Sequence, residues 1–259
     1  MKLHYGIILT LSTLSLHANA TVVKKEPCCE FSEQFQIGGN YSYVWIKPKG
    51  NHTTHGSLGG VRAIYEHRPQ DSIYAAAAFS WRSGTTEHGE TKRTLQDFNG
   101  QERIGYTFGK RRIGSARLTL FTGVGVRYLA EKVSVHSTHL VMDYTEFYVP
   151  VGFLFEDKVN SLFAWGCNVQ WMPQVFPMVR LKPLSRAQWS LTYKLSNFLI
   201  EFPFTFSTCS NRFSVIVSPF LESWHDGHST AKTTAGLVLG LPSNSYLFTG
   251  VNVSFGWSF

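Results

Sequence analysis

The last stretch of the chain, residues 246–259, alternates between apolar and polar side chains. Leu247, Val251, Val253, Phe255, Trp257 and Phe259 fall on one face, and Gly250, Asn252, Ser254, Gly256 and Ser258 fall on the other. Successive side chains of a strand point to opposite faces, so a period of two predicts a strand with one apolar and one polar side.

The same alternation recurs along the rest of the chain, between polar connections that are long and short in turn. One segment places Ile37, Tyr41 and Trp45 on a single face, and another does so with Phe147 and Phe153. Aromatic residues make up 15% of the chain and charged residues only 16%. This profile is typical of a transmembrane barrel, whose strands are apolar on one face and whose aromatic residues ring both interfaces. A large soluble β-protein is the alternative class.

The closing stretch also carries a family resemblance. Its apolar residues stand at every second position up to a terminal aromatic residue, and they are Val251, Val253, Phe255, Trp257 and Phe259. In this it resembles the closing strand of Gram-negative outer-membrane β-barrel proteins. The resemblance implies that these residues are the signal read by the barrel assembly machinery, and that the protein lies in the cell outer membrane, against its lipid. It implies no particular activity, and we expect no cofactor and no nucleic-acid partner.

The start of the chain predicts export. Lys2 and His4 precede an apolar run that ends at Leu16, and Ala18-Asn19-Ala20 follows. A basic start, a short apolar run and an Ala-x-Ala ending are typical of a secretory signal peptide, here residues 1–20. The run is too short for a membrane-spanning helix, which needs ~20 apolar residues. We therefore expect a periplasmic lead-in over residues 21–32 and one barrel domain over residues 33–259.

The predicted fold class is an all-β, antiparallel transmembrane β-barrel of about twelve strands, with ten as the alternative. The apolar face changes parity between Leu195 and Phe198, which requires either a hairpin or a bulge. A two-residue turn at Ser196-Asn197 would pair both apolar sets on one side, and we prefer this hairpin. Residues 232–241 then form the strand before the closing one. A bulge would instead give ten strands if another segment leaves the wall.

Strand parity also predicts which charges face the lumen. The basic residues are Arg62, Arg82, Arg103, Arg117, Arg127, Lys194, Arg212 and Lys232, and the acidic ones are Glu66, Glu146, Glu156, Glu201 and Glu222. A water-filled lumen with this excess of basic groups would favour anions. The alternative is a plugged lumen in which the charges pair and hold the wall together.

The loops contain three His-x-x-His spacings: His52 with His55, His136 with His139, and His225 with His228. We interpret them as solvated histidines and predict no metal site, because zinc needs three or four ligands in tetrahedral geometry. The predicted topology places the third pair at the opposite end of the barrel from the other two. The motif around Asp226 and His228 offers catalytic residue types, but no third group can be placed beside it, so we predict no catalytic residues.

Cys28 and Cys29 lie in the lead-in, and export to an oxidising compartment makes them candidates for a disulfide bond. As sequence neighbours they favour another partner over each other, so a disulfide-linked envelope protein is one expected partner. Cys167 is expected to face lipid, and Cys209 is expected in a short turn at the outer end.

The function favoured by the sequence is a diffusion pore or general envelope component with a basic-biased lumen. The alternative is a surface interaction protein, similar to an adhesin, that acts through its outer loops. An outer-membrane lipid hydrolase or protease is third, and we expect a protein that is not an enzyme.

Overall fold

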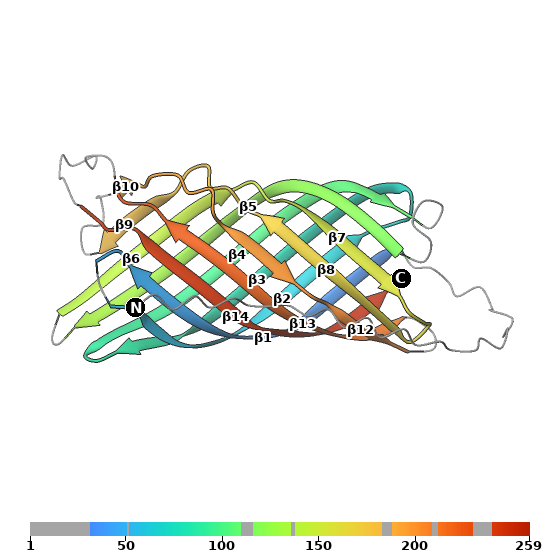
Figure 1. The fold of residues 1–259 in the computed structure, drawn as a ribbon, viewed down its shortest axis with the longest axis horizontal. Coiled ribbons are helices and arrows are strands. Elements are labelled where there is room, and N and C mark those ends of the chain that lie inside the picture. Colours follow the sequence, from blue (N-terminus) through green and yellow to red (C-terminus); the bar gives the residue numbers. More distant parts are fainter. Residues whose placement is uncertain are drawn as a thin grey trace, which may run out of the picture.

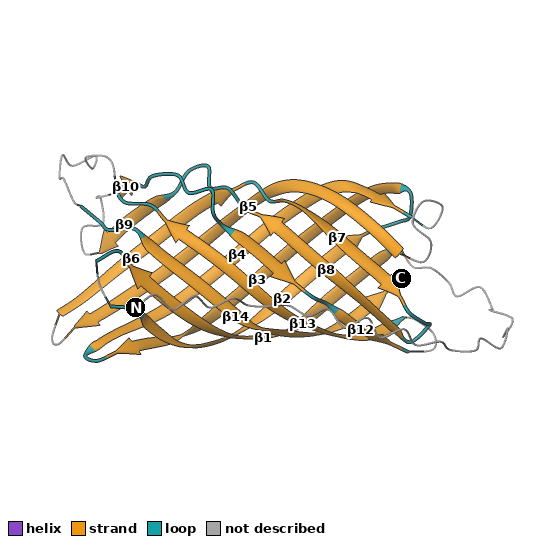
Figure 2. Ribbon diagram, viewed as in Figure 1, coloured by secondary structure: helices purple, strands orange, loops and turns teal. Residues whose placement is uncertain are grey.

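The computed structural model describes residues 32–50, 52–109, 116–135, 138–182, 188–208, 212–229 and 240–259. Their strands run obliquely along a long cylinder (Figure 1), and Figure 2 shows that strands make up most of it. The strands are β1 (Glu33–Pro48), β2 (Thr54–His67), β3 (Ser72–His88), β4 (Thr91–Phe108), β5 (Ala116–Val135), β6 (Thr138–Tyr148), β7 (Val151–Lys158), β8 (Phe163–Trp171), β9 (Met178–Lys182), β10 (Gln188–Ser190), β11 (Phe198–Glu201), β12 (Phe204–Ser207), β13 (Phe213–Asp226) and β14 (Asn244–Ser258). Within the described ranges, no helix is long and apolar enough to cross a bilayer.

The strands close into an antiparallel barrel of ten strands, as the alternative count predicts. Neighbours in sequence pair from β1 to β5, and β14 closes the ring by pairing with β1 and β13. β6 and β7 both pair with β5, and β11 and β12 both pair with β8 and β13, so each couple is one interrupted strand of the wall. β9 pairs with β6, and β10 with β9, at one end of the barrel.

Prolines account for both interruptions. Pro150 separates β6 from β7, and Pro203 separates β11 from β12. Proline has no amide hydrogen to donate to the ladder, so each of these two residues removes a ladder hydrogen bond at the interruption. The carbonyl oxygen of Pro203 still accepts a hydrogen bond from the amide of Gly166 at 2.8 Å, which holds the interrupted strand against β8.

The preferred hairpin at Ser196-Asn197 is wrong, because this segment is a bulge in a continuous wall. Phe198 pairs with Ser223, and the amide of Thr192 donates to the carbonyl oxygen of His228. The segment 192–198 is therefore one residue longer than the segment 223–228 that lies opposite it. The Asn197 side chain fills the resulting gap, since its Oδ1 accepts a hydrogen bond from the amide of His225 at 2.8 Å. One extra residue reverses the parity of the outward face, which explains the pattern that suggested a hairpin.

The predicted strand over residues 232–241 is also not part of the wall. β13 pairs directly with β14, from Asp226 opposite Asn244 to Phe213 opposite Trp257. Residues 227–243 therefore connect these two strands at one end, and residues 230–239 lie outside the described ones. The count falls from twelve to ten because the bulge merges two predicted strands and no strand lies between β13 and β14.

The two ends of the barrel are distinct. The near end carries the start of β1 and the end of β14, where the amide of Phe259 donates to the carbonyl oxygen of Glu33. The turn between β12 and β13 also lies there, because the amide of Ser258 donates to the carbonyl oxygen of Arg212. The far end carries the β1–β2, β3–β4, β5–β6 and β13–β14 connections. Cys209 itself is outside the described residues, but its turn is at the near end, contrary to the prediction.

Candidate functional site

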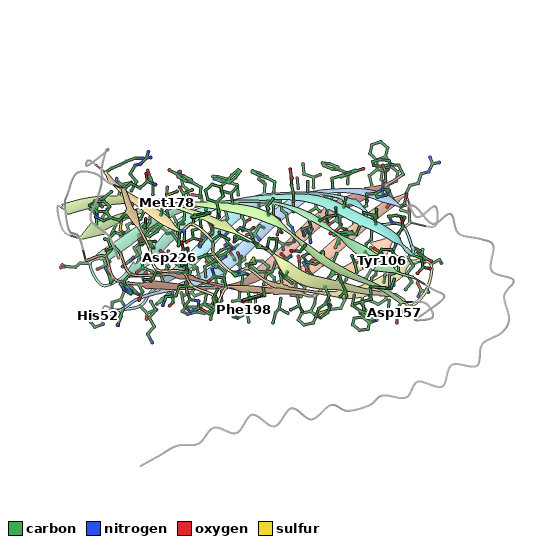
Figure 3. All side chains as sticks on the ribbon, turned by 90° about the horizontal axis from the view of Figure 1, so that it is seen from above. His52, Tyr106, Asp157, Met178, Phe198 and Asp226 are labelled. Carbon is green, nitrogen blue, oxygen red and sulfur yellow. The ribbon has the colours of Figure 1, made fainter. Side chains whose placement is uncertain are left out.

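Large apolar side chains cover the outside of the wall in two rows. On β3, β4 and β5, one row consists of Ile73, Tyr106 and Leu120, which are register partners near the termini, and the other of Trp81, Phe98 and Tyr128. Most of them are strongly exposed, for example Ile73 at 61%. Side chains of opposite parity point into the lumen, where the candidate site lies. Figure 3 draws the side chains on the ribbon, with His52 and Asp226 towards one end of the cylinder and Tyr106 and Asp157 towards the other.

The predicted lumen charges pair with one another across the barrel. Near the termini, Glu156 accepts from Arg117 and from Arg68 at 3.2 Å, and Arg103 lies 3.6 Å from Glu66. At mid-length, both carboxylate oxygens of Glu201 accept from Arg62. The remaining predicted cations do not join this network: Lys194 is half-buried in the bulge, Arg212 is exposed before β13, and Lys232 is outside the described residues.

A second network crosses the lumen nearer the far end. Arg82 bridges Asp97 and Glu222, at 2.7 Å each. Arg127 donates to Asp97 at 2.9 Å and lies 3.6 Å from Glu146. All five side chains are at most 10% exposed, and those of Arg127 and Glu146 are fully buried.

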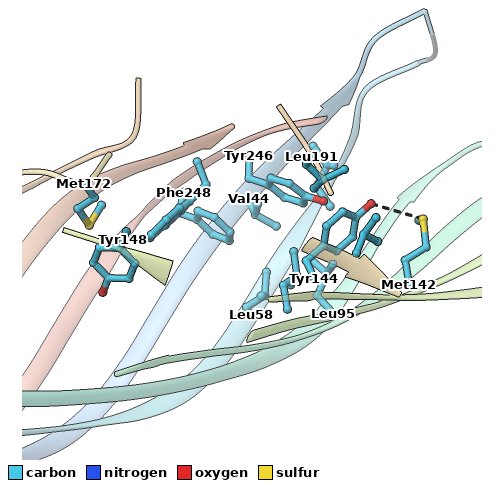
Figure 4. Packing of buried hydrophobic residues seen from close by; sticks show 14 of the residues in the cluster. Val44, Leu58, Leu95, Met142, Tyr144, Tyr148, Met172, Leu191, Tyr246 and Phe248 are labelled. Atoms are coloured by element: carbon cyan, nitrogen blue, oxygen red, sulfur yellow. Dashed lines mark hydrogen bonds between the residues drawn. The ribbon is translucent and has the colours of Figure 1, made fainter. Parts of the chain in front are cut away.

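Buried aromatic side chains pack against the second network. The guanidinium carbon of Arg82 lies 3.7 Å from the ring centre of Phe248, and that of Arg127 lies 4.6 Å from the ring centre of Trp224. Phe248 and Trp224 belong to a cluster of buried apolar residues in the far half, and Figure 4 shows how Tyr148, Tyr246, Phe248 and their neighbours in it are arranged. Cations stacked on aromatic faces are stabilised when water is excluded. The far half of the lumen is therefore closed by wall side chains.

Two cavities lie along the lumen between these layers. One of about 80 Å³ lies towards the near end and one of about 70 Å³ towards the far end, and Arg62 and Glu201 line both. A water molecule needs ~10–15 Å³ of such volume, so each cavity has room for several molecules. The Arg62–Glu201 pair lies between the two spaces.

Several buried charges were missed by the sequence analysis, namely Arg68, Arg93, Asp97, Glu131 and Asp226. Arg93 and Glu131 fall in long polar segments of the sequence, and Asp97 directly follows the first of these segments, but β4 and β5 continue through all three residues. The signal available was the inward alternation of Arg93, Leu95 and Asp97. Across the described lumen, these groups and the paired predicted ones give seven arginines and eight carboxyl groups, so the expected basic excess is not seen there.

Asp226 is the least compensated of these groups. It is fully buried, and neither of its carboxyl oxygens has a hydrogen-bond partner. Burial and the neighbouring Glu146 carboxylate raise the pKa of Asp226 well above its usual range. We therefore expect Asp226 to be protonated at neutral pH, beside the Glu146 carboxylate.

His52, His55, His225 and His228 all lie at the far end, so the pair predicted at the opposite end lies with the first one. His52 and His88 stack with ring centres 5.1 Å apart, His55 contacts the hydroxyl of Tyr43, and His228 lies 3.4 Å from the hydroxyl of Thr192. Across the described residues, no group of three or more His, Cys, Asp or Glu side chains is placed to hold a metal ion.

The residues of the candidate catalytic motif are separated by the strand. Asp226 is fully buried in the lumen, whereas the adjacent His225 points to the opposite side of β13 and is only half-buried. His136 lies outside the described residues, as do Cys28 and Cys29. Cys167, a half-buried free thiol, lies on the apolar outer face of β8.

Comparison with known proteins finds no matching family model and no matching curated protein. Among solved structures, the chain is similar to the outer membrane protease OmpT from Escherichia coli, with 8% identity, a TM-score of 0.56, and coverage of 93% of this chain and 100% of that one. The translocator domain of autotransporter NalP from Neisseria meningitidis aligns with 11% identity, a TM-score of 0.46 and 88% coverage of each chain. At these identities, the likeness to OmpT over the whole of its chain shows a shared barrel fold alone.

Proposed function

We propose that this chain is an outer-membrane β-barrel with a closed lumen that binds an acidic partner at the far end, on the cell surface. The rows of large apolar side chains around the wall support a membrane position, because a lipid-facing barrel needs an apolar band with aromatic girdles. Termini on the periplasmic side are the rule for such barrels, so the far end is external in this proposal.

The observation that carries the proposal is the closure of the lumen. A diffusion pore needs a continuous aqueous path, whereas here buried ion pairs and aromatic rings span the interior. Opening that path would expose guanidinium and carboxylate groups that now form ion pairs with one another. We therefore place the binding function on the surface and assign no catalytic step.

The far end offers a basic surface above the apolar band. Its exposed cations on or beside strand ends are Lys47, Lys49, Lys92, Lys132, Arg180 and Lys182, against the exposed acids Glu87 and Glu90. A hollow of about 460 Å³ lies between the β1–β2 and β3–β4 tips and is lined by His52, His88 and Glu90, among others. A basic rim attracts acidic partners, and the attraction weakens as salt screens it.

Planar-bilayer recording of the purified, refolded protein tests the closed lumen. We expect no steady conductance above that of the bilayer in 1 M salt. A stable, ion-selective conductance that scales with protein would contradict the closure and return the diffusion pore to first place.

Heparin binding to barrels in neutral lipid vesicles tests the basic surface. Reversal of Lys47, Lys132 and Arg180 to Glu should weaken binding at least tenfold in dilute salt. The matched control is Lys158→Glu, an exposed cation at the near end, because heparin added outside reaches only outward-facing ends in right-side-out vesicles. Equal losses in both variants, or wild-type binding that is indifferent to salt, would refute the proposed surface.

A further inference from the structure

An ionisable side chain lies in the middle of the apolar outer face. Glu102 is exposed on β4 and is the register partner of Ala77 on β3 and Val124 on β5. Along β4 it lies four residues from Tyr106 in one row and four from Phe98 in the other. The carboxyl group therefore sits midway between the two rows of large side chains.

Glu102 has no ion pair or hydrogen bond with any other described residue. The wall beside it is apolar, with Ala77 and Val124 across the ladder and Gly100 and Ile104 on its own strand. Polar side chains at membrane depth are costly, and they pair with one another or mark a functional contact. Its position therefore calls for a partner outside this copy of the barrel.

Small residues lie beside Glu102 on two strands. Ala75 and Ala77 of β3 are exposed, and the larger ring of Phe79 stands at the next outward position. A Cβ atom added at Gly100 of β4 would lie 3.7 Å from the nearest side-chain atom, in ordinary contact. Elsewhere the outer face carries bulky rings such as Phe204, Phe255 and Trp165. Small residues allow two membrane elements to approach closely, so the face around Glu102 suits packing against protein.

We infer that this β3–β5 face is a dimerisation surface for a second copy of the chain, with Glu102 opposite Glu102 near the two-fold axis. Two copies inserted in the same orientation hold Glu102 at the same depth, and a two-fold axis places a residue near it opposite its own copy. Between the two rows, the described outer face of β1 to β5 carries no Lys or Arg, so the charged group that a second copy brings is the carboxyl of Glu102. Two carboxyl groups that share a proton bind each other by a hydrogen bond, as paired carboxyls do in apolar sites.

The oligomeric state of the full mature chain in density-matched detergent, measured by sedimentation equilibrium, tests this inference. We expect the wild type to dimerise, Glu102→Leu to weaken the dimer at least tenfold, and Glu102→Gln to stay within about threefold, because amides also pair. Ala77→Phe should abolish the dimer by adding bulk, whereas the matched Val253→Phe on β14 should leave it intact. Heat-modifiable gel migration verifies that each variant is folded.

Three results would overturn the inference. One is a wild type that is monomeric both in detergent and by subunit counting in lipid vesicles. Another is a dimer that survives both Glu102→Leu and Ala77→Phe. The third is a monomer that binds a different membrane protein through the face around Ala77. None of these outcomes bears on conductance or on heparin binding, so the proposed function is tested separately.

Discussion

Replacement of Arg127 by Met should be among the most destabilising changes in the barrel. The guanidinium is fully buried, donates to Asp97 and lies 3.6 Å from Glu146, whose side chain is also fully buried. Methionine keeps much of the volume but removes the charge. Asp97 retains Arg82, whereas Glu146 loses its ion-pair partner. Breaking a buried pair in this way costs ~3–5 kcal/mol, since an uncompensated charge is left in the interior.

The matched control is Arg117→Met on the same strand. Its partner Glu156 keeps a second arginine, Arg68, at 3.2 Å, and this site is more exposed, with side-chain exposures of 14% for Arg117 and 23% for Glu156. Here we expect a loss of ~1 kcal/mol, typical of a partly solvated pair. The two variants should therefore differ by at least ~2 kcal/mol, or more than tenfold in the unfolding equilibrium.

Urea unfolding of the refolded barrel in lipid vesicles, followed by tryptophan fluorescence, measures both values, and the 7 tryptophans make this signal strong. Adding Glu146→Gln to Arg127→Met should recover part of the loss, because it removes the unpaired carboxylate. Equal losses for Arg127→Met and Arg117→Met, or no recovery in the double variant, would refute the argument and indicate a hydrated lumen.

Two further variants test single groups at the far end. Asp226→Asn should remove a pH dependence of stability. Burial and Glu146 raise the pKa of Asp226 in the folded protein, so the folded state binds a proton that the unfolded state has lost. The free energy of unfolding of the wild type should therefore fall by ~1.4 kcal/mol per pH unit from pH ~3.9 up to the folded pKa. Urea unfolding between pH 5 and pH 8 should show this slope in the wild type and not in the variant, and parallel curves would contradict it. Asn197→Ala should cost ~1–3 kcal/mol in the same assay, because the amide of His225 loses its acceptor, whereas Asn197→Asp should cost less. An Ala variant as stable as the wild type would show that water replaces the side chain.

The class of fold could be predicted from the sequence because it depends on local alternation. A strand presents every second residue to the same side, so segments such as the one through Ile37 and Tyr41 reveal themselves without knowledge of their neighbours. The antiparallel barrel and most strands of its apolar band are confirmed. The terminal assembly signal ending at Phe259 stays a prediction.

The ends of the strands could not be predicted, because the apolar signal stops where the wall leaves the apolar band. In residues 91–97, at the far end of β4, the outer face is polar and the inner face is apolar only at Leu95, so this part of the strand has the composition of a loop. For this reason Arg93 and Asp97 were not predicted to face the lumen, although they help to close it.

The strand count and the pairing of the charges depend on contacts between distant residues. A parity change near Asn197 is compatible with a hairpin or a bulge, and the choice follows from where Phe198 pairs, with Ser223 of β13 and Trp171 of β8. Likewise, Arg82 meets Glu222 from 140 positions away in the chain, and no local pattern records that approach. Alternation tells which side chains face the lumen, and only the closed ring brings them within bonding distance of one another.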